Sequence, residues 1–141
     1  MPRPPGTGGA EAARNPSTRI VVDHLGLAQP KQLPAPEEPW ADLSKLLELA
    51  QYDNVAVKVS GACTLSREPF PYNDIWEPLC RVFDAFGFDR YMWGTDWTRA
   101  INVVPYKQSV DAFRLAAGLT EDERADLMGR TLRKIYAWSS A

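Results

Sequence analysis

Three polar side chains stand at the ends of runs whose composition is typical of β-strands. His24 follows an Ile-Val-Val run, Ser60 ends a run of alternating valines, and Asp96 follows Tyr-Met-Trp-Gly-Thr. The carboxyl ends of parallel strands meet at one edge of a sheet, where α/β enzymes place their reactive groups. A histidine there can bind a metal or hold an oxyanion, and an aspartate can act as the general base for water. We therefore predict one pocket shared by these three residues.

Each of these residues also has an interpretation without catalysis. A lone histidine at a strand end can be a hydrogen-bonded structural residue, and Asp96 can be the N-cap of the following helix. Lys58 lies on the same strand face as Ser60, where its stem can simply lie along the sheet. The sequence holds one histidine and two cysteines, which is too few for a typical self-contained catalytic zinc site. The convergence of three strand ends favours the functional interpretation.

The elements that must position these side chains alternate along the chain. Segments rich in β-branched and aromatic residues predict strands at 20–24, 54–60 and 90–96. Apolar residues at helical spacing predict helices at 40–50, from 74 or 78 to 86, at 106–117 and at 121–138. Thr120 and Glu123 form a capping box for the last of these. Helices between successive strands predict an α/β fold with parallel strands.

Residues 1–18 have a different composition from the rest of the chain. They are rich in proline and glycine and show no apolar periodicity, so we predict that they are disordered and that residues 19–141 form the folded domain.

Composition and charge exclude several classes of protein. The formal net charge is −2, from 16 Lys and Arg against 18 Asp and Glu, which gives no support for a nucleic-acid partner. No apolar run approaches the ~18 residues of a membrane span, and no apolar stretch follows the N-terminal residues as in a secretory signal. Two cysteines fit a reducing compartment. We expect a cytoplasmic protein with a small-molecule substrate.

The segments that carry these residues resemble the amidohydrolase-related family, a group that includes lactone hydrolases. They read Ile-Val-Val-Asp-His-Leu-Gly at 20–26, Asn-Val-Ala-Val-Lys-Val-Ser-Gly at 54–61, and Arg-Tyr-Met-Trp-Gly-Thr-Asp-Trp at 90–97. Lys-Ile-Tyr-Ala-Trp at 134–138 resembles the family's C-terminal helix. The resemblance covers about residues 19–138, and Met-Trp-Gly-Thr-Asp-Trp is its most specific part.

The resemblance implies a fold and a reaction. The fold is a TIM-type (β/α)8 barrel, of which this chain would hold the sixth, seventh and eighth strands, so that 19–141 would be a partial barrel domain. Asp96 would activate water for attack on a lactone or a similar cyclic ester or amide, and His24 would polarise the carbonyl oxygen. In members that bind a metal, these two residues would approach a divalent ion, Zn or Mn; the sequence leaves open whether this protein binds one.

The resemblance also suggests where the substrate lies. Arg67 and Tyr72 fall in the loop after the second strand, where such enzymes hold acidic substrates, and this assignment rests on position alone. Lys58 and Ser60 are the other candidate substrate-binding residues, because they belong to the predicted pocket. The expected substrate is therefore a lactone or an acidic small molecule.

The family's first-strand His-x-His pair and its fifth-strand region have no counterpart here, and a full barrel needs about 250 residues. We expect a fragment without measurable lactonase activity of its own, or a chain completed by a partner. The open sheet edge predicts a homo-oligomer, and the sheet face carrying Ala56, Lys58, Met92 and Gly94 is expected to lack cover, which favours aggregation or a partly molten state.

Other functions remain open at this point. One alternative is a non-catalytic barrel remnant acting as an interaction module, and another is a decarboxylase of the same superfamily. A doubly wound domain with Asp96 as phosphoacceptor is disfavoured, because no acidic cluster stands at the first strand.

Overall fold

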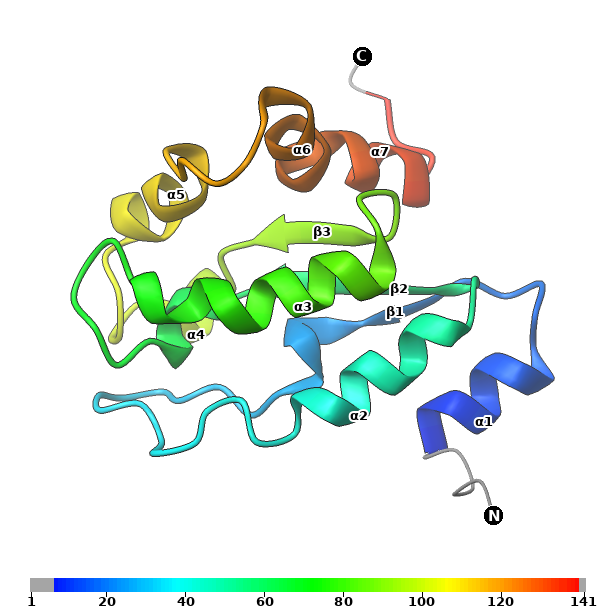
Figure 1. Cartoon of the computed structure of the whole chain (residues 1–141), viewed down its shortest axis with the longest axis horizontal. Coiled ribbons are helices and arrows are strands. Elements are labelled where there is room, and N and C mark those ends of the chain that lie inside the picture. Colours follow the sequence, from blue (N-terminus) through cyan, green and yellow to red (C-terminus); the bar gives the residue numbers. More distant parts are fainter. Residues whose placement is uncertain (1–6, 140–141) are drawn as a thin grey trace.

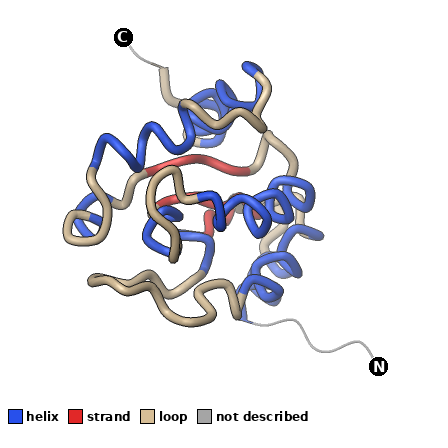
Figure 2. The backbone as a smooth tube through the Cα atoms, turned by 60° about the vertical axis from the view of Figure 1, so that its left-hand side comes forward, coloured by secondary structure: helices blue, strands red, loops and turns tan. Residues whose placement is uncertain are grey.

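The computed structural model describes residues 7–139, which form a parallel sheet surrounded by helices (Figure 1; Figure 2). The strands are β1 (Ile20–Val22), β2 (Val55–Ser60) and β3 (Tyr91–Gly94), and they lie in the order β1-β2-β3. Both pairs are parallel, with Ile20 opposite Val55 and Val57 opposite Tyr91. The predicted α/β class, strand order and strand direction are therefore confirmed.

Helices lie within each of the predicted helical segments, and further helices lie outside them. They are α1 (Thr7–Arg14), α2 (Leu43–Glu48), α3 (Trp76–Phe86), α4 (Trp97–Ala100), α5 (Tyr106–Arg114), α6 (Glu121–Ala125) and α7 (Thr131–Ile135). The short α4 was not predicted. The predicted helix 121–138 is divided by a π-helical turn over Asp126–Arg130, in which the backbone of Gly129 leaves helical geometry, as the low helix propensity of glycine allows. The predicted capping box is present.

None of the helices between residues 7 and 139 combines the length and the apolar content needed to cross a bilayer.

The N-terminal segment differs from its prediction. Residues 7–14 form α1, and Ala12 on this helix is buried. The side-chain amide of Asn54 donates hydrogen bonds to the carbonyl oxygens of Ala12, Asn15 and Thr18, at 3.1, 3.0 and 3.0 Å. The predicted disorder of 1–18 is thus wrong for 7–18, because a contact from a residue far along the chain holds this segment; residues 1–6 lie outside the described part.

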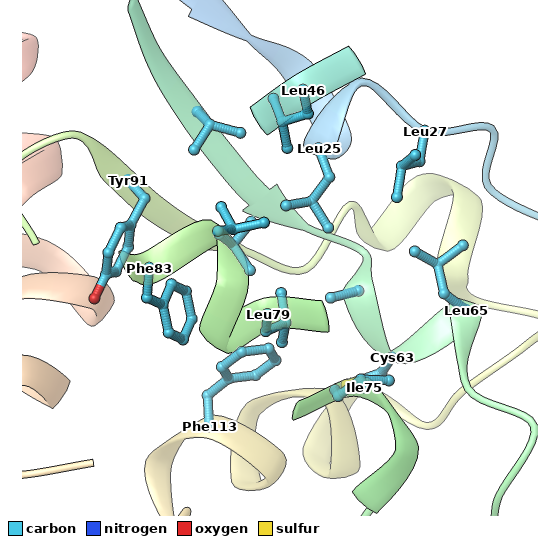
Figure 3. Packing of buried hydrophobic residues seen from close by; sticks show 14 of the residues in the cluster. Leu25, Leu27, Leu46, Cys63, Leu65, Ile75, Leu79, Phe83, Tyr91 and Phe113 are labelled. Atoms are coloured by element: carbon cyan, nitrogen blue, oxygen red, sulfur yellow. The ribbon is translucent and has the colours of Figure 1, made fainter. Parts of the chain in front are cut away.

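The main core lies between one face of the sheet and the helices. In Figure 1, α3 crosses in front of the sheet, α1 and α2 lie on the β1 side, and α5 to α7 lie on the β3 side. Alternate β2 residues, Val55, Val57 and Val59, are all buried, as their spacing predicts. Tyr91 stacks on Phe83 with ring centroids 4.4 Å apart (Figure 3). This packing fixes β2 and β3 firmly against α3.

The opposite face of the sheet is better covered than expected. Ala56 and Met92, predicted to lack cover, are 0% and 1% exposed, while Lys58 and Gly94 are half-buried. Leu132 of α7 lines one cavity together with Lys58 and Met92. The C-terminal helix therefore contributes part of the cover on this face.

Candidate active site

The backbone is left-handed at two residues of the candidate site, His24 and Asp96. His24, just after β1, has φ 50°, and Asp96, just after β3, has φ 48°. Residues other than glycine rarely adopt this left-handed conformation, which costs about 1–3 kcal/mol and concentrates at functional sites. Beyond His24, Leu25 and Gly26 are also left-handed, so the chain turns sharply away from the sheet and leaves the imidazole at its edge.

The side chains of the three strand ends meet. His24 Nδ1 lies 2.7 Å from Ser60 Oγ and 3.5 Å from Asp96 Oδ2. The Asp96 side chain is 10% exposed and that of His24 is 32% exposed. Within residues 7–139, Asp96 Oδ2 is buried and accepts no hydrogen bond. The predicted convergence of His24, Ser60 and Asp96 is therefore confirmed as geometry, while their chemical roles remain predictions.

Asp96 does not act as a helix cap. It occupies the N-cap position of α4, but its side chain makes no capping hydrogen bond. A capping residue normally has an extended backbone, whereas Asp96 is left-handed. This conformation leaves the carboxylate free to face His24.

A cavity of about 270 Å³ contains the site. It is lined by His24, Lys58, Ser60, Met92, Trp93, Gly94, Asp96 and Leu132. A side chain at Gly94 would narrow it, because a Cβ there would lie 3.3 Å from Ser60 Cβ. The cavity thus combines a carboxylate, an imidazole, a hydroxyl and an amine within an apolar wall.

Lys58 forms an ion pair at the cavity rim. Its Nζ lies 2.8 Å from Asp23 Oδ1. The hydrogen bond from Lys58 holds the pKa of Asp23 below its usual value, and the same bond raises the pKa of Lys58. The amine is therefore a fixed positive charge, rather than only a stem packed along the sheet.

Arg67 and Tyr72 are not brought to this cavity. The backbone N–H of Arg67 donates to Asp74, 2.7 Å away, and its guanidinium donates to the Pro36 carbonyl, at 3.2 Å. The Tyr72 hydroxyl donates to Gln108 Oε1, at 2.8 Å, and burial raises the pKa of this phenol. Tyr72 lines a separate cavity of about 530 Å³. The loop after β2 packs against the segments around α3 and α5, and the substrate roles of both residues remain predictions.

Gln29 is a site residue that sequence reasoning missed. Its Nε2 donates to the carbonyl oxygen of Ser60 at 2.5 Å, and the residue is 8% exposed. Next to Ser60, Gly61 has φ 67°, and a Cβ there would overlap the Gln29 amide. Gln29 lies in a Pro-rich loop without a recognisable motif, so only the folded chain brings it to the end of β2.

The residues present do not by themselves complete a metal site. His24 Nδ1 and Asp96 Oδ2 are 3.5 Å apart, a separation compatible with two ligands of one ion at about 2.1 Å each. However, Nδ1 is already hydrogen-bonded to Ser60. Within residues 7–139 no group of three or more His, Cys, Asp or Glu side chains could hold a metal ion. His24 and Asp96 are thus two candidate ligands without a third.

The chain is similar to sequences of known hydrolases. The amidohydrolase family profile matches residues 9–138. L-fucono-1,5-lactonase of Burkholderia ambifaria is 41% identical over 91 residues, which are 62% of this chain and 29% of that protein. 4-Sulfomuconolactone hydrolase of Rhizobium radiobacter is 32% identical over 84 residues, 57% of this chain and 25% of that protein.

Solved structures agree with these relatives. An amidohydrolase of Burkholderia multivorans with bound zinc superposes with a TM-score of 0.75 at 26% identity, covering 93% of this chain and 48% of that one. A putative 2-pyrone-4,6-dicarboxylic acid hydrolase of Pseudomonas putida gives a TM-score of 0.65 at 26% identity, and the match covers 87% of this chain and 44% of that one. The chain thus spans about half the length of these solved structures and under a third of the curated relatives.

Proposed function

Since this chain belongs to the amidohydrolase family, we propose that the edge formed by His24, Ser60 and Asp96 is part of an active site that hydrolyses lactones. The observation that carries the proposal is the buried, unbonded Asp96 Oδ2, 3.5 Å from an imidazole nitrogen at the carboxyl edge of a parallel sheet. The relatives named as lactone hydrolases support the substrate class.

The reaction follows from these two side chains. Water attacks the lactone carbonyl while the Asp96 carboxylate accepts its proton, and the carbonyl oxygen, as it becomes negative, receives a hydrogen bond from the imidazole of His24. The ring C–O bond then breaks, and the departing oxygen takes the proton back from Asp96. The product is the ring-opened hydroxy acid.

Lys58 supplies a positive charge beside these groups. Its ion pair with Asp23 leaves it half-buried at the cavity wall. A substrate that carries a carboxylate or sulfonate would be held there by charge-assisted hydrogen bonds. We therefore infer that the substrate is an acidic lactone.

The proposal places β1, β2 and β3 as the sixth, seventh and eighth strands of a TIM-type (β/α)8 barrel. The motif resemblance supports this numbering, and the coverage of 48% of a solved amidohydrolase supports a partial barrel. A zinc ion is bound in that relative; here His24 and Asp96 are the candidate ligands, and further donors would come from outside the described residues.

A chimera tests the proposal. Residues 9–138 of this chain, which the family profile matches, replace the corresponding residues of the Burkholderia ambifaria lactonase, and the folded product is assayed on a panel of lactones. We expect turnover of at least one lactone. Asp96→Asn should lower kcat by about 10²–10⁴, the usual loss of a general base.

The matched control is Asp53→Asn, the same chemical change at an exposed residue before β2. It should leave the rate unchanged. Full activity of the Asp96→Asn chimera would refute the assigned base, and a folded chimera inactive on every lactone would favour the non-catalytic alternative.

A further inference from the structure

Ser60 makes a single side-chain hydrogen bond, and it goes to the histidine of the site. The residue is 5% exposed, and within residues 7–139 its hydroxyl has no hydrogen-bond partner other than His24 Nδ1, 2.7 Å away. Nε2 of the same ring makes no hydrogen bond there and is not among the buried unbonded atoms, so it is accessible on a residue that lines the cavity.

The direction of this bond follows from counting donors and acceptors. If Nδ1 carried the ring proton, it would donate to Ser60 Oγ, and the buried hydroxyl proton would have no acceptor. A buried donor left without a partner is strongly unfavourable. If the hydroxyl donates to Nδ1 instead, both atoms of this bond have a partner, and the proton of the neutral ring resides on Nε2.

Asp96 favours the opposite arrangement. Its buried Oδ2 lies 3.5 Å from the same Nδ1 and has no hydrogen bond within the described residues. A carboxylate in that position attracts an Nδ1–H. The hydroxyl of Ser60 and the carboxylate of Asp96 therefore compete for one ring nitrogen.

The main chain of Ser60 is held on both sides. Gln29 Nε2 binds its carbonyl oxygen at 2.5 Å, and Gly94 on β3 allows the strands to approach so closely that a Cβ there would lie 3.3 Å from Ser60 Cβ. These contacts keep the hydroxyl directed at the imidazole.

We propose that Ser60 is a positioning residue: its hydroxyl donates to His24 Nδ1, fixes the ring proton on Nε2 and keeps His24 from bonding to Asp96. This deepens the proposed function, on which it rests. Nε2–H becomes the donor that faces the substrate carbonyl, and the Asp96 carboxylate stays free to accept a proton from water. The hydroxyl thus acts on the histidine rather than on the substrate.

The test is direct because the chain contains one histidine. The ring nitrogens of a neutral imidazole have well-separated ¹⁵N chemical shifts according to which one carries the proton. The 141-residue chain is labelled with ¹⁵N-histidine, and its spectrum is recorded well above the ordinary histidine pKa of about 6.5. We expect the Nε2–H form in roughly tenfold or greater excess.

Ser60→Ala should reverse this preference, because Nδ1–H can then donate to Asp96. Adding Asp96→Asn to Ser60→Ala should remove the reversal, and Ser60→Thr, which keeps a hydroxyl, should retain the wild-type spectrum. Ser109→Ala is the matched control: Ser109 is also buried, and its hydroxyl donates to the Tyr106 carbonyl instead.

The wild-type spectrum alone can overturn the proposal, even if a variant fails to fold. A wild-type ring protonated on Nδ1, or a folded Ser60→Ala variant with an unchanged spectrum, would do so. Because no substrate is used, the result is independent of the chimera assay. A ring protonated on Nδ1 would contradict the role of Ser60 without contradicting lactone hydrolysis. An inactive chimera would contradict lactone hydrolysis without contradicting the role of Ser60.

Discussion

Gly61→Ala should destabilise the protein strongly, because two separate features of the structure require glycine at this position. Its φ of 67° costs a residue with a Cβ about 1–2 kcal/mol. The added methyl group would also overlap the Gln29 amide, which is nearly buried and binds the Ser60 carbonyl. Displacing that amide leaves the carbonyl without its partner, at a cost of about 1–3 kcal/mol. The expected loss in the free energy of unfolding is therefore about 2–5 kcal/mol.

Urea unfolding followed by fluorescence of the five tryptophans measures this loss at one fixed protein concentration, since self-association would make stability depend on concentration. Gly118→Ala is the control: its φ lies outside the left-handed region and no heavy atom lies within 4 Å of the added Cβ, so its effect should stay within about 0.5 kcal/mol.

A double variant separates the two contributions. In a Gln29→Ala background the overlap is gone, so Gly61→Ala should cost only the backbone part, about 1–2 kcal/mol. Equal costs in both backgrounds would refute the contact with Gln29. If Gly61→Ala were as stable as the wild type, the left-handed conformation at residue 61 would be refuted as well.

A thiol reagent should modify only exposed Cys80 in the native chain, because Cys63 is 3% exposed and burial raises its pKa to about 12; two fast-reacting thiols would contradict this. The Asp23–Lys58 pair stabilises the fold between a lower and an upper pH limit. The contribution of Asp23, whose pKa is lowered, is present above its usual 3.8 and is lost as the pH falls through the folded value. The contribution of Lys58, whose pKa is raised, is present below pH 10.5, its usual pKa, and is lost as the pH rises through the pKa in the folded protein. Asp23→Asn should therefore cost about 0.2–1 kcal/mol near neutral pH, because both side chains are partly exposed, and unfolding curves with no loss at that pH would argue against the pair. Sedimentation velocity should show self-association through the sheet edges, since within residues 7–139 β1 and β3 each pair with β2 alone; a monomer at all concentrations would contradict this.

The sequence determined the features that depend on local pattern. Alternating valines in β2 and helical spacing between the strands predicted a parallel sheet, and the structure has that sheet in the predicted order. His24, Ser60 and Asp96 could be grouped because strand ends of parallel neighbours meet at one edge. The capping box of Thr120 and Glu123 is equally local, and it is present.

Tertiary structure decided the features that depend on contacts between distant segments. Asn54 holds α1 in a segment predicted to be disordered, and Gln29 reaches Ser60 from a loop without a motif. Loop position suggested Arg67 and Tyr72 as substrate-binding residues, but the place of a loop is set by what it packs against, and neither residue lines the cavity that contains Asp96. Periodicity specifies which face of an element is apolar, whereas side-chain partners depend on how distant elements pack, which no local pattern encodes.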